Sequence, residues 1–484
     1  MLDPIVHADL AAILPASAFL TAEEDTRPYE CDALTMFREL PAAVALPDTE
    51  SQVAAILARC HAARVPVVAR GAGTGLSGGA LPHHDGVLLS LAKFRRIVVI
   101  DPLTRTAVVQ PGVRNAMITE AVAPHGLYYA PDPSSQIACT IGGNVAENSG
   151  GVHCLKYGLT VHNVRRVRGV LTSGEIVEFG GDALDSPGYD LLALIHGSEG
   201  MLAVITEITV KLTPKPQAAQ VALAAFDDVT KAGNAVAAVI GAGIVPAGLE
   251  MMDQAATRAV EEFVQAGYPL DAKAVLLVEA DGTPEEVAAD MADIRTVLAD
   301  AGATQIRVSK DEAQRLLYWS GRKAAFPAVG RLTPDYCCMD GTIPRKALAD
   351  VLQRIEELSR KHGLRCANVF HAGDGNLHPL IFFDANVEGE TERAAAFGAA
   401  IGELCIEVGG TITGEHGVGV EKLAQMCVQF RPAELECFLG IKAVFDPHGL
   451  LNPGKGVPTL HRCAEFGKMF VHHGRLPHPE IPRF

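Results

Sequence analysis

The sequence predicts an α+β protein of two or three domains. Its 484 residues are more than one hydrophobic core usually serves, and 48% hydrophobic with 20% charged residues is typical of a globular chain. A proline-containing segment at 211–216 reads as a linker. After it, expected strands at 221–226 and 275–279 alternate with expected helices at 229–240 and 284–301. That alternation indicates a second domain with helices on one face of a sheet.

Charge and cysteine content exclude several classes of function. The formal net charge is 41 − 57 = −16, which argues against nucleic acid and anionic membrane surfaces as partners. Eleven cysteines include no CxxC pair, so zinc-ribbon and iron–sulfur spacings are absent. The odd count, and an N-terminus without a basic signal region, favour a reducing compartment, so we expect a cytoplasmic protein. The longest apolar run, 235–248, is too short and glycine-broken to span a bilayer.

The N-terminal half leads into a glycine-dense loop. Residues 1–40 look helical, Thr49 has the spacing of a helix N-cap, and 65–69 reads as a buried strand. The loop at 70–79 contains a literal GxGxxG, but Pro82 and further glycines break the segment that would have to be a helix in a dinucleotide fold. Two readings stay open: an anion-binding cradle of backbone N–H groups, or a plain surface turn.

Two further glycine-rich segments follow, at 131–151 and 197–205, each joined to an expected strand. One such segment is usually only a turn. Three of them permit close approach of backbone to a ligand and together predict one extended, multi-part ligand.

The stretch from His371 to His378 predicts a β-hairpin. Apolar runs flank Asp374-Gly375, and that dipeptide favours a two-residue type I′ turn. Pairing outward from such a turn sets His371 directly opposite His378, close enough to share a divalent metal with a carboxylate from elsewhere. The alternative is a hairpin whose histidines pack or face solvent.

The motifs then resemble those of a known family. The segments 66–82, 131–151, 197–212, 371–378, 414–419 and 452–455 look like the FAD-linked D-2-hydroxyacid dehydrogenases of the vanillyl-alcohol-oxidase type, and within them the flavin-binding catalytic subunits of bacterial glycolate oxidases. The resemblance implies a two-subdomain FAD-binding domain with an α+β substrate domain. The expected division is an N-terminal helical segment at 1–40, the FAD domain at 41–216, the substrate domain at 217–445 and a returning segment at 446–484.

The resemblance also assigns cofactor residues. It implies non-covalent FAD, with the pyrophosphate on the first glycine loop and the other segments around adenine and isoalloxazine. The expected contacts are Arg70, Gly71, Ala72, Gly73, Thr74, Gly75, Leu76, Ser77, Pro131, Asp132, Thr140, Gly142, Gly143, Asn148, Gly151, Gly200, Ile205, Asn452 and Lys455.

The same resemblance implies a divalent metal on His371, His378 and Glu415, with zinc, iron and manganese all compatible. It makes His416 the catalytic base and places Arg322 on the substrate carboxylate. An imidazole has a suitable pKa for a base near neutral pH, and a guanidinium can clamp a carboxylate. Ordinary readings remain: Arg322 in an ion pair, Glu415 as a solvated carboxylate and His416 as a plain loop histidine.

The implied activity is oxidation of a short 2-hydroxy acid, glycolate or D-lactate, with hydride transfer to flavin. An asparagine and a lysine of the 2-hydroxyglutarate branch are replaced here at Leu380 and near Cys337, which disfavours a long diacid. By resemblance, electrons pass to a second flavoprotein-like subunit and an iron–sulfur subunit, which could hold the chain at the cytoplasmic face of the inner membrane. The alternatives are a 2-hydroxyglutarate-type dehydrogenase, a flavin-free metallohydrolase and a non-catalytic flavoprotein subunit.

Overall fold

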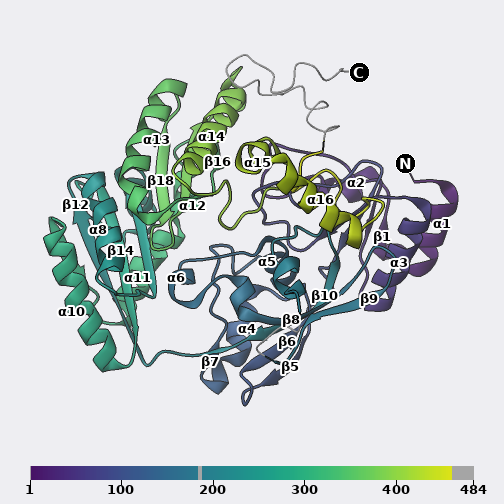
Figure 1. Cartoon of the computed structure of the whole chain (residues 1–484), viewed down its shortest axis with the longest axis horizontal. Helices are drawn as coiled ribbons and strands as arrows, with labels where there is room; N and C mark the ends of the chain where they lie inside the picture. The colour runs from purple at the N-terminus through teal and green to yellow at the C-terminus, as the bar shows by residue number, and fades with distance from the viewer. Residues whose placement is uncertain (1, 184–187, 460–484) are drawn as a thin grey trace.

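The N-terminal part of the chain contains a four-stranded sheet. The computed structural model describes residues 2–183 and 188–459 (Figure 1). Strands lie in the order β1-β2-β4-β3, with β2 and β3 parallel to β4 and β1 antiparallel to β2. Thr49 caps the second long helix, because its side chain accepts from the Gln52 amide. The elements are α1 (Pro4–Ile13), β1 (Phe19–Leu20), α2 (Glu23–Thr26), β2 (Ala43–Ala45), α3 (Glu50–Ala63), β3 (Val67–Arg70) and β4 (Val87–Ser90).

A five-stranded antiparallel sheet follows, in the order β5-β6-β10-β8-β9. Apolar residues of α4, α5 and α7 share one core with this sheet. The elements are β5 (Ile97–Asp101), β6 (Thr106–Val109), α4 (Asn115–Val122), β7 (Leu127–Tyr128), α5 (Ile141–Glu147), α6 (Cys154–Tyr157), β8 (Val164–Val170), β9 (Ile176–Gly180), α7 (Leu191–Ile195) and β10 (Val204–Lys211).

The largest sheet has eight antiparallel strands, in the order β15-β12-β14-β13-β18-β19-β16, with β17 also paired to β19. Its elements are β12 (Ala218–Phe226), α8 (Val229–Gly241), β13 (Gly248–Asp253), α9 (Gln254–Val264), β14 (Ala274–Gly282), α10 (Pro284–Asp300), β15 (Gln305–Val308), α11 (Glu312–Lys323), α12 (Ala325–Val329), β16 (Asp335–Cys338), β17 (Gly341–Thr342), α13 (Leu348–His362), β18 (Cys366–His371), β19 (Asn376–Phe383) and α14 (Glu390–Glu407).

Helices cover both faces of this sheet, so the expectation of helices on one face was wrong. α8, α10, α13 and α14 pack on one face, and α9, α11 and α12 pack on the other. The reason is visible in β12, which is buried without interruption from Val221 to Phe226. A strand that is apolar at every position needs cover on both faces.

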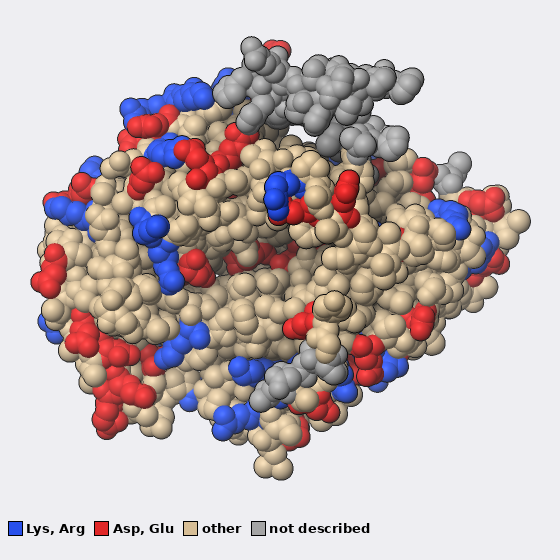
Figure 2. Space-filling view, viewed as in Figure 1, with Lys and Arg blue, Asp and Glu red and all other residues tan. Residues whose placement is uncertain are grey.

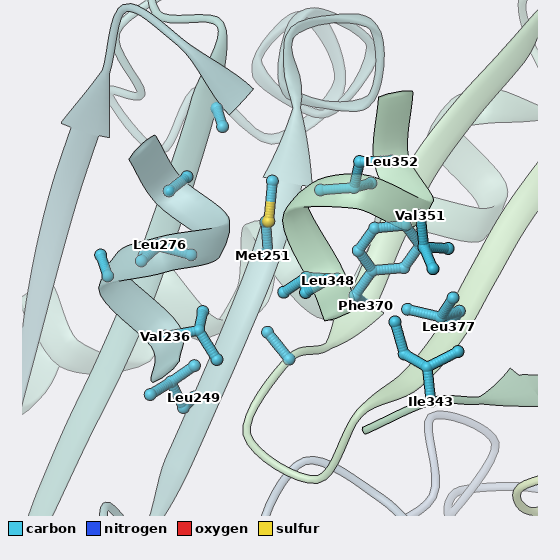
Figure 3. Close-up of a cluster of buried hydrophobic side chains, with 14 of the residues drawn as sticks. Val236, Leu249, Met251, Leu276, Ile343, Leu348, Val351, Leu352, Phe370 and Leu377 are labelled. Atoms are coloured by element: carbon cyan, nitrogen blue, oxygen red, sulfur yellow. The ribbon is translucent and has the colours of Figure 1, made fainter. Parts of the chain in front are cut away.

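The core on the α8 and α13 side fixes the orientation of the histidine hairpin. Phe370 of β18 and Leu377 of β19 are directly opposed and lie among Met251, Leu276 and the α13 side chains (Figure 3). Because side chains alternate along a strand, the neighbouring residues His371 and His378 emerge on the opposite face. The sequence therefore anchors the hairpin with one face and presents its histidines with the other.

The expected linker and the returning segment both pair with the N-terminal half. Within 211–216, β11 (Thr213–Pro214) pairs antiparallel with β7. The segment is therefore part of a sheet, whereas the sequence predicted a linker. After α15 (Leu423–Gln429) and α16 (Pro432–Phe445), Leu451 forms a parallel bridge with Val67 of β3. The division into four segments stays a prediction.

On the face shown in Figure 2, positively charged Lys and Arg side chains are interspersed with negatively charged Asp and Glu side chains. Among the residues that the structure describes, no helix is long and apolar enough to cross a membrane.

Candidate active site

The first glycine loop connects β3 to β4 and no helix follows it before β4 begins, as the sequence predicted. Gly73 has a φ of 71°, in the left-handed region that favours glycine, and the Arg70 guanidinium lies directly beneath it. Arg70 is held there by a 2.7 Å hydrogen bond that its Nη1 donates to the Cys31 carbonyl. The loop is thus stiffened on the side that faces Arg70 and open to a ligand on the opposite side.

All three glycine-rich segments meet in one cavity of about 520 Å³. The cavity continues to the C-terminal part of the chain that contains the eight-stranded sheet, called the cap below. This volume is in the range of cofactor and substrate pockets. The wall on the N-terminal side consists of Ala69–Leu76, Gly79, Ala80, Leu91, Pro111, Pro133–Ser135, Ile137, Cys139, Thr140, Gly142–Asn144, Ala146, Glu147, Ser149, Glu199, Gly200, Ala203 and Ile205. The wall on the cap side consists of Lys323, Phe326, Pro327, Tyr336, His378, Glu415 and His416.

The hairpin forms, but with a register that differs from the predicted one. His371 pairs with Asn376 and His378 pairs with Val369, so four residues rather than two connect the strands. Gly375 has a φ of 83°, whereas Asp374 is not in the left-handed region that a type I′ turn would require. Because the shift is by two residues, both histidines stay on one face as diagonal neighbours, with ring centroids 5.0 Å apart.

Both histidines present Nε2 to the same carboxylate oxygen. Nε2 of His378 lies 3.0 Å and Nε2 of His371 3.4 Å from Oε1 of Glu415. On the far side of the rings, Nδ1 of His371 donates to Glu250 at 2.9 Å and Nδ1 of His378 donates to the Met339 carbonyl at 3.1 Å. Two Nε2 atoms and a carboxylate oxygen converge, and this is a donor set that can hold a divalent cation.

The ring planes favour this triplet over a second one. His371 and His378 are nearly perpendicular, at 88°, so their lone pairs can point at one ion. Cys338, His378 and His416 also bring their ligand atoms within 4.8 Å of one another. However, His378 and His416 are stacked at 10°, and the lone pairs of parallel rings do not converge. The triplet His371, His378 and Glu415 therefore fits a divalent ion better.

Asp340 anchors the loop that carries Glu415 and His416. Its carboxylate accepts hydrogen bonds from the backbone N–H groups of Gly414, Glu415 and His416 and from Nζ of Lys422. Burial alone would raise the pKa of Asp340, but the nearby cationic groups, Lys422 among them, hold it below its usual range. Burial lowers the pKa of His416 to about 4. The ring is therefore neutral at pH 7 and able to accept a proton.

Arg322 lies behind the cavity wall, with 1% of its side chain exposed, and does not line the cavity. Its Nη2 is 2.7 Å from Oε2 of Glu250, the carboxylate that also accepts from His371. Nε and Nη1 of Arg322 have no hydrogen-bond partner among the described residues. The role predicted for Arg322 on the substrate stays a prediction.

Comparison with known proteins identifies the family. Residues 41–180 match the FAD binding domain family and residues 215–456 match the family of FAD linked oxidases, C-terminal domain. The chain belongs to the FAD-linked oxidases. It is 62% identical over 471 residues to the glycolate oxidase subunit GlcD of Escherichia coli (strain K12), which covers 97% of this chain and 94% of that protein. It is 33% identical over 448 residues to the D-lactate dehydrogenase of Anaerostipes hadrus, with 90% and 94% covered.

Two solved structures share the fold. p-Cresol methylhydroxylase superposes with a TM-score of 0.80 at 17% identity, covering 94% of this chain and 97% of that one. 4-Ethylphenol oxidase from Gulosibacter chungangensis gives a TM-score of 0.78 at 16% identity, with 95% and 98% covered. The predicted vanillyl-alcohol-oxidase-type fold is confirmed, and this FAD-linked oxidase is an oxidoreductase.

The residues present fit FAD. Oγ1 of Thr140, Nδ2 of Asn144 and Oε2 of Glu147 line the cavity wall but are buried without a hydrogen-bond partner among the described residues. Their spacing of four and three residues places them along one side of α5. Gly71 approaches Thr140 so closely that an added Cβ would collide with its hydroxyl. Unpaired polar groups beside such a close approach are what a long polar ligand would satisfy.

Seven of the predicted cofactor residues support the cavity wall from outside. Asn452 and Lys455 bind the Gly79 carbonyl, and Asn148 ends α5 in a left-handed conformation. The set comprises Ser77, Pro131, Asp132, Asn148, Gly151, Asn452 and Lys455, whereas the other twelve predicted cofactor residues line the cavity.

Two functional candidates were missed by sequence reasoning. Glu250 is a carboxylate in the otherwise apolar strand Gly248–Met252, and a buried charge among hydrophobic residues was the available signal. Asp340 follows Cys337-Cys338-Met339 and precedes Gly341, and that pattern gives no distinguishing signal. Both lie far in sequence from the residues they hold, so only the fold brings them together.

A charged clasp joins the cap to the FAD-binding half. His153 lies between Asp132, at 2.9 Å, and Glu279 of β14, at 3.2 Å. Glu279 also binds Arg315 and Trp319 of α11, and Asp132 is 3.5 Å from Lys323 at the end of that helix. The clasp therefore fixes α11, which carries Arg322, against the FAD-binding half.

The clasp predicts a pH-dependent stability. Burial alone would lower the pKa of His153, but the two carboxylates raise it from 6.5 to about 10. A raised pKa gives stability that is complete below pH 6.5 and is lost as pH rises through about 10. We expect His153→Gln to lower the free energy of unfolding by about 2 kcal/mol at pH 7. Denaturant titrations of both proteins at neutral and alkaline pH should show this difference shrink above pH 10; a constant difference would rule out a charged His153.

Proposed function

We propose that this FAD-linked oxidase oxidises a short 2-hydroxy acid, glycolate to glyoxylate or D-lactate to pyruvate. The observation that carries the proposal is the convergence of His371, His378, Glu415 and His416 at the cap end of the FAD-binding cavity. The E. coli and A. hadrus relatives carry names that refer to acids of this class, glycolate and D-lactate.

His416 is the proposed proton acceptor for the substrate hydroxyl. It is neutral at pH 7, its Nδ1 has no hydrogen-bond partner among the described residues, and Asp340 fixes its backbone. A divalent ion held by His371, His378 and Glu415 would supply Lewis-acid polarisation of that hydroxyl, and bound FAD would supply the hydride acceptor. The residues of the chain thus orient the alcohol and take its proton.

The carboxylate of the substrate needs a cation in a strongly acidic chain. Arg322 is the proposed partner, and its two unpaired N–H-bearing nitrogens support this. It would have to be reached from the cavity, whereas Lys323 lines the cavity directly. Comparing Arg322→Met with Lys323→Met shows which of the two residues binds the carboxylate. Replacing that residue should raise KM for glycolate at least about tenfold. An unchanged KM in Arg322→Met would remove that assignment.

A short substrate is favoured by the cap wall. Leu380 is fully buried and pairs across the sheet with Cys338, and neither side chain lines the cavity. The wall here is instead formed by the apolar or aromatic residues Phe326, Pro327 and Tyr336. These three residues offer only one polar group, the Tyr336 hydroxyl, to the distal carboxylate of a diacid.

Electrons would leave through partner subunits. Among the described residues only two groups of three or more metal-binding side chains occur, and neither has the four cysteines of an iron–sulfur cluster. We propose a second flavoprotein-like subunit and an iron–sulfur subunit as acceptors, which would also account for any attachment to a membrane face. The E. coli relative is itself named as a subunit.

Anaerobic substrate addition tests the proposal. Glycolate or D-lactate should bleach the visible flavin band of the purified holoprotein within one turnover, because reduction needs no partner. L-Lactate and D-2-hydroxyglutarate serve as matched acids that should react far more slowly. A protein that carries flavin but is bleached by none of these acids would contradict the proposed function.

A further inference from the structure

Glu147 is a half-buried residue whose carboxyl group the proposed chemistry does not use. It is the last residue of α5 and lines the cavity, and its Oε2 is shielded from solvent without a hydrogen-bond partner among the described residues. An ionised Oε2 would lack a hydrogen-bond donor among the described residues, and burial outweighs the attraction of the nearby Lys422 and Lys455 ammonium groups. The site therefore favours a neutral carboxylic acid with a proton available to donate.

A neighbouring carboxylate shows the contrast. Burial raises the pKa of Glu199 as well, but Glu199 accepts backbone hydrogen bonds from Val418 and Gly419, both at 2.7 Å, which favour its ionised form and which Oε2 of Glu147 lacks. A Cβ added at Gly417 would collide with Oε2 of Glu147 and come within 3.1 Å of Glu199, so the two acids lie side by side. Two adjacent acids whose surroundings differ in this way divide into one charged and one neutral group. Burial and Glu199 accordingly raise the pKa of Glu147 well above its usual value.

The position of Glu147 along the cavity indicates which part of FAD it meets. α5 runs along the wall from Thr140, against the first glycine loop, to Glu147, against Gly417, which directly follows His416 in the sequence. Seven residues of helix span about 10 Å. If the glycine loop holds the pyrophosphate, the flavin ring lies toward His416, at the Glu147 end. This step rests on the proposed function, which places the reacting edge of the flavin beside His416.

We propose that Glu147 is a protonated acid that donates a hydrogen bond to an acceptor atom of the isoalloxazine and so stabilises the reduced cofactor. Reduction places additional electron density on the ring nitrogens and carbonyl oxygens. A donor at fixed distance gains strength from that change, whereas a polar group at the other end of α5 does not. Glu147 thereby tunes how readily the flavin accepts electrons, a role separate from the proton transfer assigned to His416.

Equilibration of the holoprotein with a reference redox dye tests this without any hydroxy acid. Glu147→Ala should lower the equilibrium constant for flavin reduction about tenfold, because one hydrogen bond to a charged acceptor is lost. Glu147→Gln keeps a donor of similar shape and should stay within about twofold of the native protein. Thr257→Val is the matched control: it removes a buried hydroxyl of α9 that has no hydrogen-bond partner among the described residues and does not line the cavity, so it should leave the equilibrium constant unchanged.

An infrared difference spectrum of the native holoprotein, reduced minus oxidised, provides a second measurement if the alanine variant does not fold. We expect a band of a protonated carboxyl that moves on reduction and is missing in Glu147→Gln. A native equilibrium constant in Glu147→Ala, an equal shift in the alanine and glutamine variants, or absence of the carboxyl band would each overturn the proposal. If the Glu147 variants behave as expected but no hydroxy acid bleaches the flavin, the proposed function alone is rejected.

Discussion

His416→Ala is expected to lower kcat by about a hundredfold to ten-thousandfold while FAD stays bound. The reason is that the described residues provide no other free histidine at the cap end of the cavity: the neighbouring His371 and His378 direct Nε2 at Glu415 and have Nδ1 hydrogen-bonded. Pre-steady-state reduction of the flavin by glycolate is the appropriate measurement, since it isolates the step that loses its proton acceptor. The rate of reduction should fall, and the flavin spectrum before mixing should not change.

His362→Gln is the matched control. His362 ends α13 and stacks on Phe397, with ring centroids 5.4 Å apart, remote from the cavity-lining residues. It should reduce at the native rate. Added imidazole should partly restore the alanine variant, because the deletion leaves space at the position of the ring. Full turnover by His416→Ala without imidazole would show that another group accepts the proton.

The strongest local signals in the sequence predicted elements well. Thr49 marked the start of a helix, and the expected strand at 275–279 and helix at 284–301 occur within β14 and as α10. These segments are governed by neighbours a few residues away. The absence of a helix after the first glycine loop was also predicted correctly, because Pro82 disfavours a helix whatever the remainder of the chain does.

Long-range constraints decided what the sequence could not. The turn of the hairpin was predicted from Asp374-Gly375 alone, but Gly375 packs against the Ile343 backbone and the Gly373 amide donates to Leu249, so the surrounding cap selects a four-residue loop. The shared face of the two histidines survived only because the register moved by an even number. Glu250 and Asp340 illustrate the remaining gap: each holds functional residues through contacts that no local pattern encodes.

His378→Ala is expected to remove the bound metal and most of the turnover while leaving FAD in place. His378 contributes one of three converging ligand atoms, and losing one ligand of a three-residue site costs orders of magnitude in metal affinity. The flavin should remain, because the unpaired groups of α5 and the first glycine loop lie on the opposite wall. Elemental analysis beside flavin quantification on the same sample measures both effects and also identifies the metal.

Glu250→Gln should cause an intermediate loss of metal. It leaves all three proposed ligands intact but weakens the acceptor that orients His371, so metal affinity should fall by about tenfold to a hundredfold rather than disappear. The expected order of metal content is therefore native, then Glu250→Gln, then His378→Ala, at equal FAD content. Loss of flavin from His378→Ala at full metal content would reverse the assignment of the two walls, because the hairpin would then be holding the cofactor. Equal metal in all three proteins would instead place the ion outside the cluster of His371, His378 and Glu415.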